Sequence, residues 1–327
     1  MENQVEINVT PKYATDDGSS AIKFAASMEA VSVYPSRVYK GASLNAQGLP
    51  SKSSFKVGTV NYSVDPVEMN ILPTQNADFQ INEISRVLIH DTLRKNGVTG
   101  ECEIIVTVPC GRYFTDPESL SKNEAYINRK KDNLLNGPIS YNDGEEVIRI
   151  TNVHVLPEGL PALAYCLKEL KLKKGMTCLV DIGSTTCDVI LFSGTSISSY
   201  AMLDSAQGGN GAGCGMFDLL YAFRDAVSLT DASLVNREDK ISTEFIKAKE
   251  TESHPYHSTA MALIGAFEAR LKAKIETVIG HELEKFDHVI FSGGGANAIN
   301  PKNLTLKGHS TAKPQEDNAR GCHIIVK

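Results

Sequence analysis

The residues best suited to chemistry lie in segment 179–188, which reads Leu-Val-Asp-Ile-Gly-Ser-Thr-Thr-Cys-Asp. Asp181 closes a short apolar run, and Gly183 supplies the backbone freedom that a tight turn needs. Three hydroxyl side chains follow, those of Ser184, Thr185 and Thr186. Successive N–H groups in such a turn form a concavity that binds phosphate, and a carboxylate at a strand end suits Mg²⁺, which prefers oxygen ligands. The segment predicts strand, turn and strand, either as an anion site or as an ordinary hairpin with a polar turn.

A second copy of this pattern lies near the N-terminus, where residues 16–23 read Asp-Asp-Gly-Ser-Ser-Ala-Ile-Lys. When Asp16 is aligned with Asp181, Gly18 falls on Gly183. The candidate nucleotide-binding residues of this copy are Asp17, Gly18, Ser19 and Ser20. Two such hairpins in one chain suggest two related halves that face the same nucleotide.

Two glycine-rich segments add further candidates. An apolar strand over 289–292 is followed by Gly293, Gly294, Gly295 and, shortly after, Asn297. Backbone without side chains can approach a flat ligand closely at such a place. Segment 207–215, with Gly208 and Gly209, fits neither a P-loop nor a dinucleotide-binding strand–turn–helix pattern. It is predicted to be a flexible loop that faces the nucleotide, or else a plain mobile loop.

These three motifs, in this order, resemble the phosphate 1, phosphate 2 and adenosine signature of the superfamily of actin, heat-shock chaperone ATPases and sugar kinases. Within it, the chain most resembles the ParM (StbA) family of actin-like plasmid-segregation proteins. The similarity extends over nearly the whole chain, in segments 16–23, 87–97, 104–113, 127–135, 153–164, 181–188 and 289–296.

The resemblance implies an α/β, actin-like fold with two ribonuclease-H-like domains that flank a nucleotide cleft. Domain I is expected over 1–172, with an inserted rim subdomain at about 41–95 and a C-terminal return over 312–327. Domain II is expected over 173–311, with its own rim subdomain at about 227–257. The implied cofactors are ATP, or alternatively GTP, and Mg²⁺.

The resemblance also implies roles for particular residues. Lys23 becomes a phosphate contact, where its position alone would suggest a solvated strand lysine. Asp16 and Asp181 hold Mg²⁺, mainly through its waters. Glu158 and Asp181 orient the water that attacks the γ-phosphate, although a carboxylate just before a helix can simply stabilise the positive helix end.

The implied function is ATP-driven assembly into dynamic filaments that segregate plasmid DNA through a DNA-bound, ParR-like adaptor. A small-molecule kinase of the same superfamily, acting on a sugar or an acid, is the main alternative, because shared fold does not settle function. A chaperone-type ATPase would need an appended peptide-binding domain, for which 327 residues leave no room.

The amino-acid composition further limits the class of protein to which the chain can belong. The chain has 42% hydrophobic and 22% charged residues, as a globular protein of two domains does. Its net charge of −6 disfavours direct DNA binding, which selects for Lys and Arg clusters. No apolar run is long enough for a bilayer and the N-terminus is not a signal peptide, so we expect a cytoplasmic protein without membrane contact. The seven cysteines contain no C-x-x-C pair and are expected to be buried free thiols.

Hydrophobic periodicity and turn signals predict the strands and helices that position these residues. The predicted strands cover 5–15, 21–26, 30–39, 57–62, 104–109, 146–155, a sheet within 177–200, and 289–292. The predicted helices cover 81–94, 118–135, 162–170, 216–226, 261–278 and 316–319, and 323–326 is a closing strand or a helix end. Within helix 118–135, the cluster Arg129, Lys130 and Lys131 is predicted to lie on a solvated face that could meet a neighbouring subunit. His90 is predicted to lie on a polar face or at a core edge rather than to bind a ligand.

Overall fold

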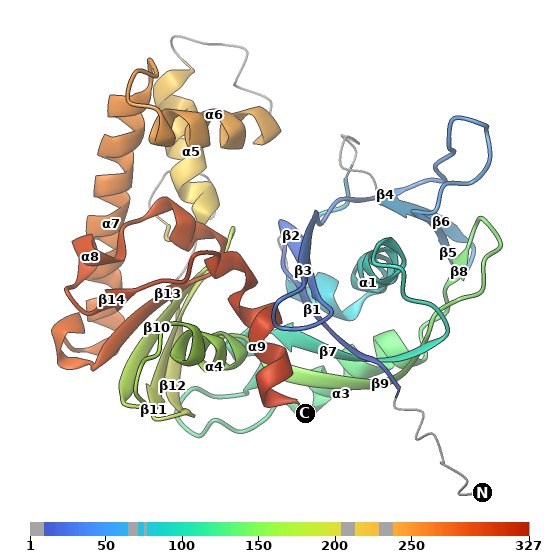
Figure 1. Ribbon diagram of the computed structural model, residues 1–327, viewed down its shortest axis with the longest axis horizontal. Coiled ribbons are helices and arrows are strands. Elements are labelled where there is room, and N and C mark those ends of the chain that lie inside the picture. Colours follow the sequence, from blue (N-terminus) through green and yellow to red (C-terminus); the bar gives the residue numbers. More distant parts are fainter. Residues whose placement is uncertain (1–9, 65–70, 75–76, 204–212, 229–237, 327) are drawn as a thin grey trace, which may run out of the picture. The chain divides into compact units, whose positions relative to one another are not determined.

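The computed structural model describes residues 10–64, 71–74, 77–203, 213–228 and 238–326 (Figure 1). The chain forms two compact units. Unit 1 comprises Met1–Tyr113, Lys122–Pro161 and Ala319–Lys327, and unit 2 comprises Phe114–Ser121 and Ala162–Asn318. The domain limits expected from the sequence, with a boundary after residue 172, stay a prediction.

The main sheet of unit 1 has the strand order β3-β2-β1-β7-β9. Its strands are β1 (Lys12–Asp17), β2 (Ala21–Ala25), β3 (Val31–Pro35), β7 (Glu101–Val108) and β9 (Arg149–Pro157). The first three form an antiparallel meander, whereas β1 and β9 both run parallel to β7. Residues 104–106 in β7 are fully buried, as their continuous apolar run predicts. Because parallel strands end at the same edge of a sheet, the last residues of β1, β7 and β9 share one edge.

The helical elements of unit 1 are η1 (Ala77–Ile81), α1 (Glu83–Lys95), α2 (Cys110–Tyr113), α3 (Glu124–Leu135) and most of α9 (Asp317–Ile325). The prediction that α3 starts at 118 is wrong, because the Asn123 side chain caps the helix by accepting from the Tyr126 N–H (3.1 Å). Of the two alternatives for 323–326, the helix end is confirmed, because α9 continues to Ile325. The first strand covers Lys12–Asp17, so residues 10 and 11 of the predicted strand 5–15 are not part of it, and residues 5–9 lie outside the described residues.

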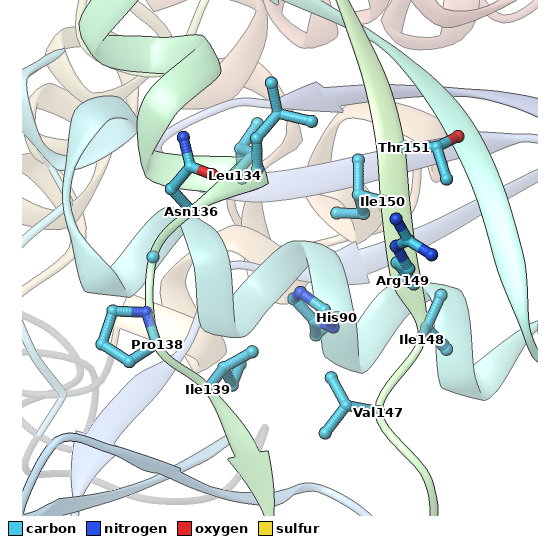
Figure 2. Close-up of a pocket in the computed structure, with 12 residues that line it drawn as sticks. His90, Leu134, Asn136, Pro138, Ile139, Val147, Ile148, Arg149, Ile150 and Thr151 are labelled. Carbon is cyan, nitrogen blue, oxygen red and sulfur yellow. The ribbon is translucent and has the colours of Figure 1, made fainter.

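Unit 1 contains a cavity of about 660 Å³, which is lined by His90, residues 134–139 and residues 147–151. Figure 2 shows these lining residues. The His90 ring nitrogen Nδ1 is 2.9 Å from the Tyr141 hydroxyl. Burial, aided by the charges of Arg86 and Arg94, lowers the pKa of His90 to about 3. His90 is therefore a neutral core residue at physiological pH, whereas a polar face or a core edge was predicted for it. The lining includes none of the predicted site residues.

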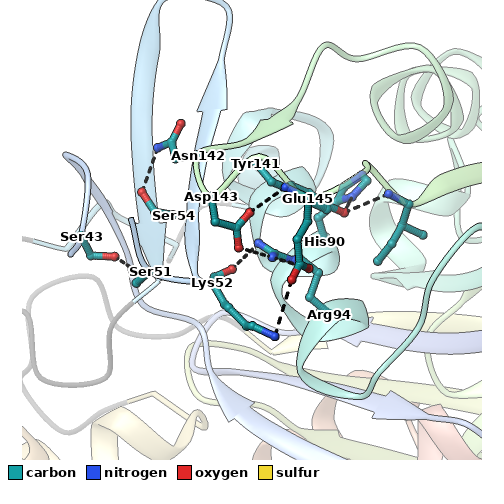
Figure 3. Close-up of polar contacts among 11 residues, drawn as sticks. Ser43, Ser51, Lys52, Ser54, His90, Arg94, Tyr141, Asn142, Asp143 and Glu145 are labelled. Atoms are coloured by element: carbon teal, nitrogen blue, oxygen red, sulfur yellow. Dashed lines mark hydrogen bonds and ion pairs between the residues drawn. The ribbon is translucent and has the colours of Figure 1, made fainter. Parts of the chain in front are cut away.

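A second sheet in unit 1 has the order β4-β6-β5-β8. Its strands are β4 (Val38–Lys40), β5 (Ser54–Val57), β6 (Val60–Val64) and β8 (Ser140–Tyr141). The single strand predicted over 57–62 is thus a hairpin, because Gly58 takes a left-handed φ of 59° at its turn. Arg94, at the end of α1, joins this sheet to the following loop through Asp143 (2.5 Å) and Glu145 (3.0 Å), and it stacks on the Tyr141 ring (Figure 3).

The sheet of unit 2 has the order β12-β11-β10-β13-β14. Its strands are β10 (Met176–Ile182), β11 (Cys187–Ser193), β12 (Ser196–Leu203), β13 (His288–Ser292) and β14 (Gly308–His309). Strands β10 to β12 form an antiparallel meander, and β13 runs parallel to both β10 and β14. The strand order and directions therefore repeat those of unit 1.

The helical elements of unit 2 are α4 (Leu160–Glu169, from Ala162 onward), α5 (Met216–Val227), α6 (Glu238–Glu250), α7 (His257–Ile279), η3 (Leu283–Lys285), η4 (Gly294–Ala298), α8 (Pro301–Leu304) and η5 (Pro314–Glu316). The stripe predicted for α7 is buried at Ile264, Phe267, Leu271 and Ile275, whereas Met261 and Val278 at its two ends are exposed. All seven cysteines are buried free thiols, as predicted. Among the described residues, no helix has the length and apolar character needed to cross a bilayer.

Candidate functional site

The first predicted turn connects β1 to β2 in unit 1. Asp16 pairs across the hairpin with Lys23, and the Lys23 Nζ lies 3.1 Å from Asp16 Oδ2. Thr107 Oγ1 donates to the other carboxylate oxygen of Asp16 (2.8 Å). A Cβ on Gly18 would lie 2.9 Å from the Lys23 Nζ, so the absent side chain gives the ammonium room at the turn. The structure thus brings together the predicted metal-binding carboxylate, the predicted phosphate-binding lysine and the turn glycine.

The backbone of this turn is held from one side. The carbonyl oxygens of residues 17–20 each accept a hydrogen bond from within unit 1. The donors are, in order, Gln80 Nε2 (3.1 Å), Ser36 Oγ (2.7 Å), Thr74 Oγ1 (2.5 Å) and the Ser36 backbone N–H (3.0 Å). In a planar trans peptide, the N–H points away from the preceding carbonyl. The N–H groups of the turn are therefore directed away from these donors, as an anion-binding concavity requires.

Asp17 lies on the face of β1 opposite to Asp16 and is 0% exposed. Its Oδ2 lies 2.6 Å from Lys130 Nζ and accepts from Ser85 Oγ (2.6 Å). Burial raises the pKa of Asp17 and lowers that of Lys130, and the attraction between the two charges opposes both shifts. Because the Asp17 side chain is not available to a nucleotide, only the backbone of Asp17 could make the predicted nucleotide contact. The prediction of a solvated Lys130 is wrong, because this side chain is also 0% exposed.

Glu158 directly follows β9 and precedes α4. Its N–H donates to the Val108 carbonyl (2.8 Å), and the Cys110 thiol donates to its carbonyl (3.2 Å). Gly159 turns the chain into the helix with a left-handed φ of 82°. Because β1, β7 and β9 are parallel, this places the partly exposed Glu158 at the same sheet edge as Asp16.

The second predicted turn connects β10 to β11 in unit 2. The Gly183 N–H donates to the Thr186 carbonyl (2.9 Å), which closes the turn over Ser184 and Thr185. The first N–H groups of α5 donate to the carbonyls of Gly183 (3.0 Å) and Ser184 (2.9 Å). The backbone carbonyls are again held from one side, as in unit 1. Gly208 and Gly209, predicted to face the nucleotide, lie outside the described residues.

The three glycines after β13 have different surroundings. A Cβ on Gly293 would lie 2.3 Å from Asp181 Oδ1, and one on Gly295 would lie 2.3 Å from the Ile182 side chain. These two glycines therefore allow the turn to pack closely on the end of β10. Gly294 is exposed, and no atom lies within 4 Å of the place for its Cβ. It presents bare backbone on an open side, as the prediction of a flat ligand requires.

Asn297 is exposed beside Gly294, and its side-chain amide donates to the Gly294 carbonyl (3.3 Å). The Lys249 ammonium, from α6, donates to the Asn297 carbonyl. Lys249 belongs to the charged run 247–252. Lys249 is the residue of that run whose ammonium reaches the glycine turn.

Asp181 ends up among further carboxylates. Its Oδ2 accepts from the Asn318 amide (2.9 Å), and Asp188 faces it across the β10–β11 ladder. Burial and the charge of Asp181 raise the pKa of Asp188 to about 7, and Asp188 Oδ1 has no hydrogen-bond partner among the described residues. Asp317 nearby accepts from Thr311, Ser292 and Cys166, and burial raises its pKa to about 7.

This excess of carboxylate oxygens fits a hard cation such as Mg²⁺. Among the described residues, no group of three or more His, Cys, Asp or Glu is arranged to hold a metal directly. Sequence reasoning gave no role to Asp188 or Asp317. The second aspartate of the 181–188 motif was a usable signal for Asp188, because residues equidistant from a two-residue turn pair across a hairpin.

The Asp188→Asn variant is expected to be more stable than the parent protein at pH 8, by up to about 4 kcal/mol, with a smaller difference at pH 5. The pKa of Asp188 is about 7 in the folded chain, against an ordinary value of 3.8. The folded state binds this proton more tightly, so stability is lost as the pH rises through that interval. Urea titrations at both pH values measure the effect. The exposed Asp225→Asn is the control, and equal stability of Asp188→Asn and parent at pH 8 would contradict the assigned shift.

The same strand order in both units, with an aspartate–glycine turn at the same place in each, is the arrangement of actin-like proteins. An archaeal actin homologue, Ta0583, is similar over 97% of this chain and 99% of its own, with a TM-score of 0.75 and 16% identity. Its complex with ADP matches with a TM-score of 0.73 and 17% identity, over 97% and 99% of the two chains. A 15-stranded ParM filament from Clostridium botulinum matches with a TM-score of 0.68 and 16% identity, over 97% and 98%. The fold is therefore actin-like.

A family model described as "Plasmid segregation protein ParM, N-terminal" matches residues 12–169. Segment 12–169 therefore belongs to the ParM family, and the chain as a whole has the actin-like fold. Among curated proteins, no sequence matches the chain.

Proposed function

We propose that this protein is an ATPase that assembles into dynamic filaments with ATP and segregates plasmid DNA through a DNA-bound adaptor. The observation that carries the proposal is the duplicated turn, in which backbone carbonyls are held from one side in both units, so that the N–H groups that follow these carbonyls point away from the donors. The ADP complex of an archaeal actin homologue supports nucleotide as that ligand. The filament structure of a ParM relative supports self-association.

In this proposal each unit supplies one turn to the same nucleotide, which is ATP or alternatively GTP. The N–H groups at Gly18–Ser20 and Ser184–Thr186 bind phosphate oxygens, and Lys23 adds a positive charge beside the first turn. The open backbone of Gly294 accommodates the adenosine. Positioning and charge neutralisation carry most of phosphoryl transfer, so little covalent chemistry is required of the protein.

A bound Mg²⁺, held mainly through its waters by Asp16 and Asp181, would neutralise part of the phosphate charge. Glu158 and Asp181 accept hydrogen bonds from the attacking water and orient it toward the γ-phosphate. Because parallel strands bring Asp16 and Glu158 to one edge, unit 1 can position both a metal-binding group and a water-orienting group.

The DNA contact is assigned to a ParR-like adaptor rather than to this chain. A net charge of −6 disfavours direct contact with the DNA backbone, which is bound by clusters of Lys and Arg. The protein alone should show negligible binding to random DNA at physiological salt, with or without ATP. The adaptor, bound to its cognate DNA, should recruit filaments in the ATP-bound state.

Light scattering after addition of Mg-ATP tests this function, and we expect a rise that decays as ATP is consumed. Gly294→Val is the matched variant. No atom lies within 4 Å of the position that a Cβ would take at Gly294, so the variant should fold normally. Its side chain should obstruct the nucleotide, so the rise in light scattering should be lost. Lys168→Met, on an exposed position of α4, should scatter like the parent. ATP consumption only when a sugar or an acid is supplied, without scattering, would instead identify a small-molecule kinase.

A further inference from the structure

A closed group of three polar side chains lies directly behind the first turn. Lys130 from α3, Asp17 from β1 and Ser85 from α1 are each 0% exposed. The Lys130 ammonium is 2.6 Å from Asp17 Oδ2 and donates to Ser85 Oγ (3.0 Å), and Ser85 Oγ itself donates to Asp17 Oδ2 (2.6 Å). Three elements far apart in the sequence therefore meet at one carboxylate oxygen.

This group lies next to the first turn. Asp17 is the last residue of β1, and Gly18 follows it in the predicted phosphate-binding turn. Its own carbonyl is held by Gln80, so both its side chain and its backbone are fixed. The charge of Lys130 also interacts with those of Glu158 and Asp16. The buried ammonium is thus paired with Asp17 and also attracted by two further carboxylates at this end of the sheet.

The buried ion pair between Lys130 and Asp17 is not expected to add much to the stability of the fold. Removing two charges from water offsets most of their mutual attraction, and neutral residues of similar shape are often as stabilising. A buried ion pair does, however, fix the positions of its two side chains. Moving or removing one partner leaves the other as an unpaired buried charge, which strongly destabilises the folded state. The other Asp17 oxygen, Oδ1, has no hydrogen-bond partner among the described residues, so Lys130 and Ser85 provide the side-chain bonds seen there.

We propose that Lys130 is a positioning residue that locks the end of β1, and with it the Gly18 turn, in the geometry that binds the phosphates of a nucleoside triphosphate. The inference rests on the proposed nucleotide-binding function. It assigns to α3 a role in phosphate binding although Lys130 touches no ligand. The recognised ligand chemistry is the triphosphate and not the nucleoside.

Lys130→Met, Asp17→Asn and the double variant test the lock, with Lys131→Met as control on the next, partly exposed residue of α3. Melting temperatures are measured at pH 5.5 and pH 8, and affinities for Mg-ATP and for AMP by calorimetry. Lys130→Met should melt about 10 °C lower at pH 8, with a smaller loss at pH 5.5, because the unpaired Asp17 can then take up a proton. The neutral double variant should melt near the parent temperature.

The double variant should nevertheless bind Mg-ATP about tenfold more weakly, with AMP affinity nearly unchanged, because a small displacement of the turn affects the β- and γ-phosphates first. A general structural defect would weaken both ligands equally and would overturn the proposal. So would a double variant with parental ATP affinity. If the double variant does not fold, the ratio of ATP to AMP affinity in Lys130→Met at pH 5.5 decides in the same way. If neither the parent protein nor the control Lys131→Met binds Mg-ATP, the proposed function itself is refuted, and this outcome is distinct from failure of the Lys130 proposal.

Discussion

Replacing Asp181 with asparagine is expected to lower ATP hydrolysis about 100-fold while the protein stays folded. Asparagine has the same shape, and its carbonyl oxygen can still accept the hydrogen bond from the Asn318 amide. What is lost is the negative charge that the proposal assigns to a magnesium-bound water and to the attacking water. Such preorganised electrostatic groups act where charge develops, so their removal affects the rate more than the binding. Phosphate release under single-turnover conditions measures this rate.

The exposed Asp225→Asn serves as the control for Asp181→Asn, since it removes one negative charge from unit 2 without touching the turn. A second readout is the pKa of Asp188, which the charge of Asp181 helps to raise. That pKa should fall in Asp181→Asn, and this would verify that the substitution acted locally. Hydrolysis within a few-fold of the parent would refute the catalytic assignment.

Local signals in the sequence were sufficient for the turns and their strands. In both copies an aspartate lies two residues before the turn glycine and hydroxyl residues follow that glycine, so each hairpin could be recognised alone. Repetition of that hairpin led to the expectation of two related halves, and both sheets do have the same strand order. The buried strand β7 was equally clear, because a continuous apolar run has no solvated face.

Contacts between distant segments could not be predicted in this way. Ser36, Thr74 and Gln80 hold the first turn, yet each is an ordinary polar residue in its own neighbourhood. Asp317 likewise reaches the cluster around Asp181 only through the fold. These side chains meet the turns by tertiary packing, and nothing in their local sequence marks them.

Lys130 is a different case, because the sequence contained a signal that this lysine is buried, but its basic neighbours favoured a solvated position. Its neighbours Arg129 and Lys131 suggested a solvated basic cluster, but Tyr126 and Leu134 lie four residues before and after it and are buried. Residues at i and i+4 share a helix face, so Lys130 lies on the apolar stripe of α3. A lone lysine on such a stripe requires a buried acid, and Asp17 supplies it.

The Glu158→Gln variant is expected to bind ATP and assemble, yet hydrolyse ATP about 100-fold more slowly, so that its filaments persist after ATP addition. The hydrogen bonds that fix the Glu158 backbone, to Val108 and from Cys110, do not use the carboxyl group. Glutamine should therefore preserve the turn into α4 and remove only the negative charge that would orient and polarise water. Light scattering and phosphate release, recorded together, separate assembly from hydrolysis.

Glu169→Gln, at the exposed far end of α4, is the matched control and should assemble and disassemble like the parent. The two outcomes for Glu158→Gln distinguish its two interpretations. If the carboxylate only stabilised the positive end of α4, its loss would lower the melting temperature slightly and leave hydrolysis per bound ATP unchanged. Failure of Glu158→Gln to bind nucleotide at all would also identify a structural residue. Long-lived filaments with retained ATP occur only if Glu158 acts on the attacking water, because assembly needs the bound triphosphate whereas disassembly needs its cleavage.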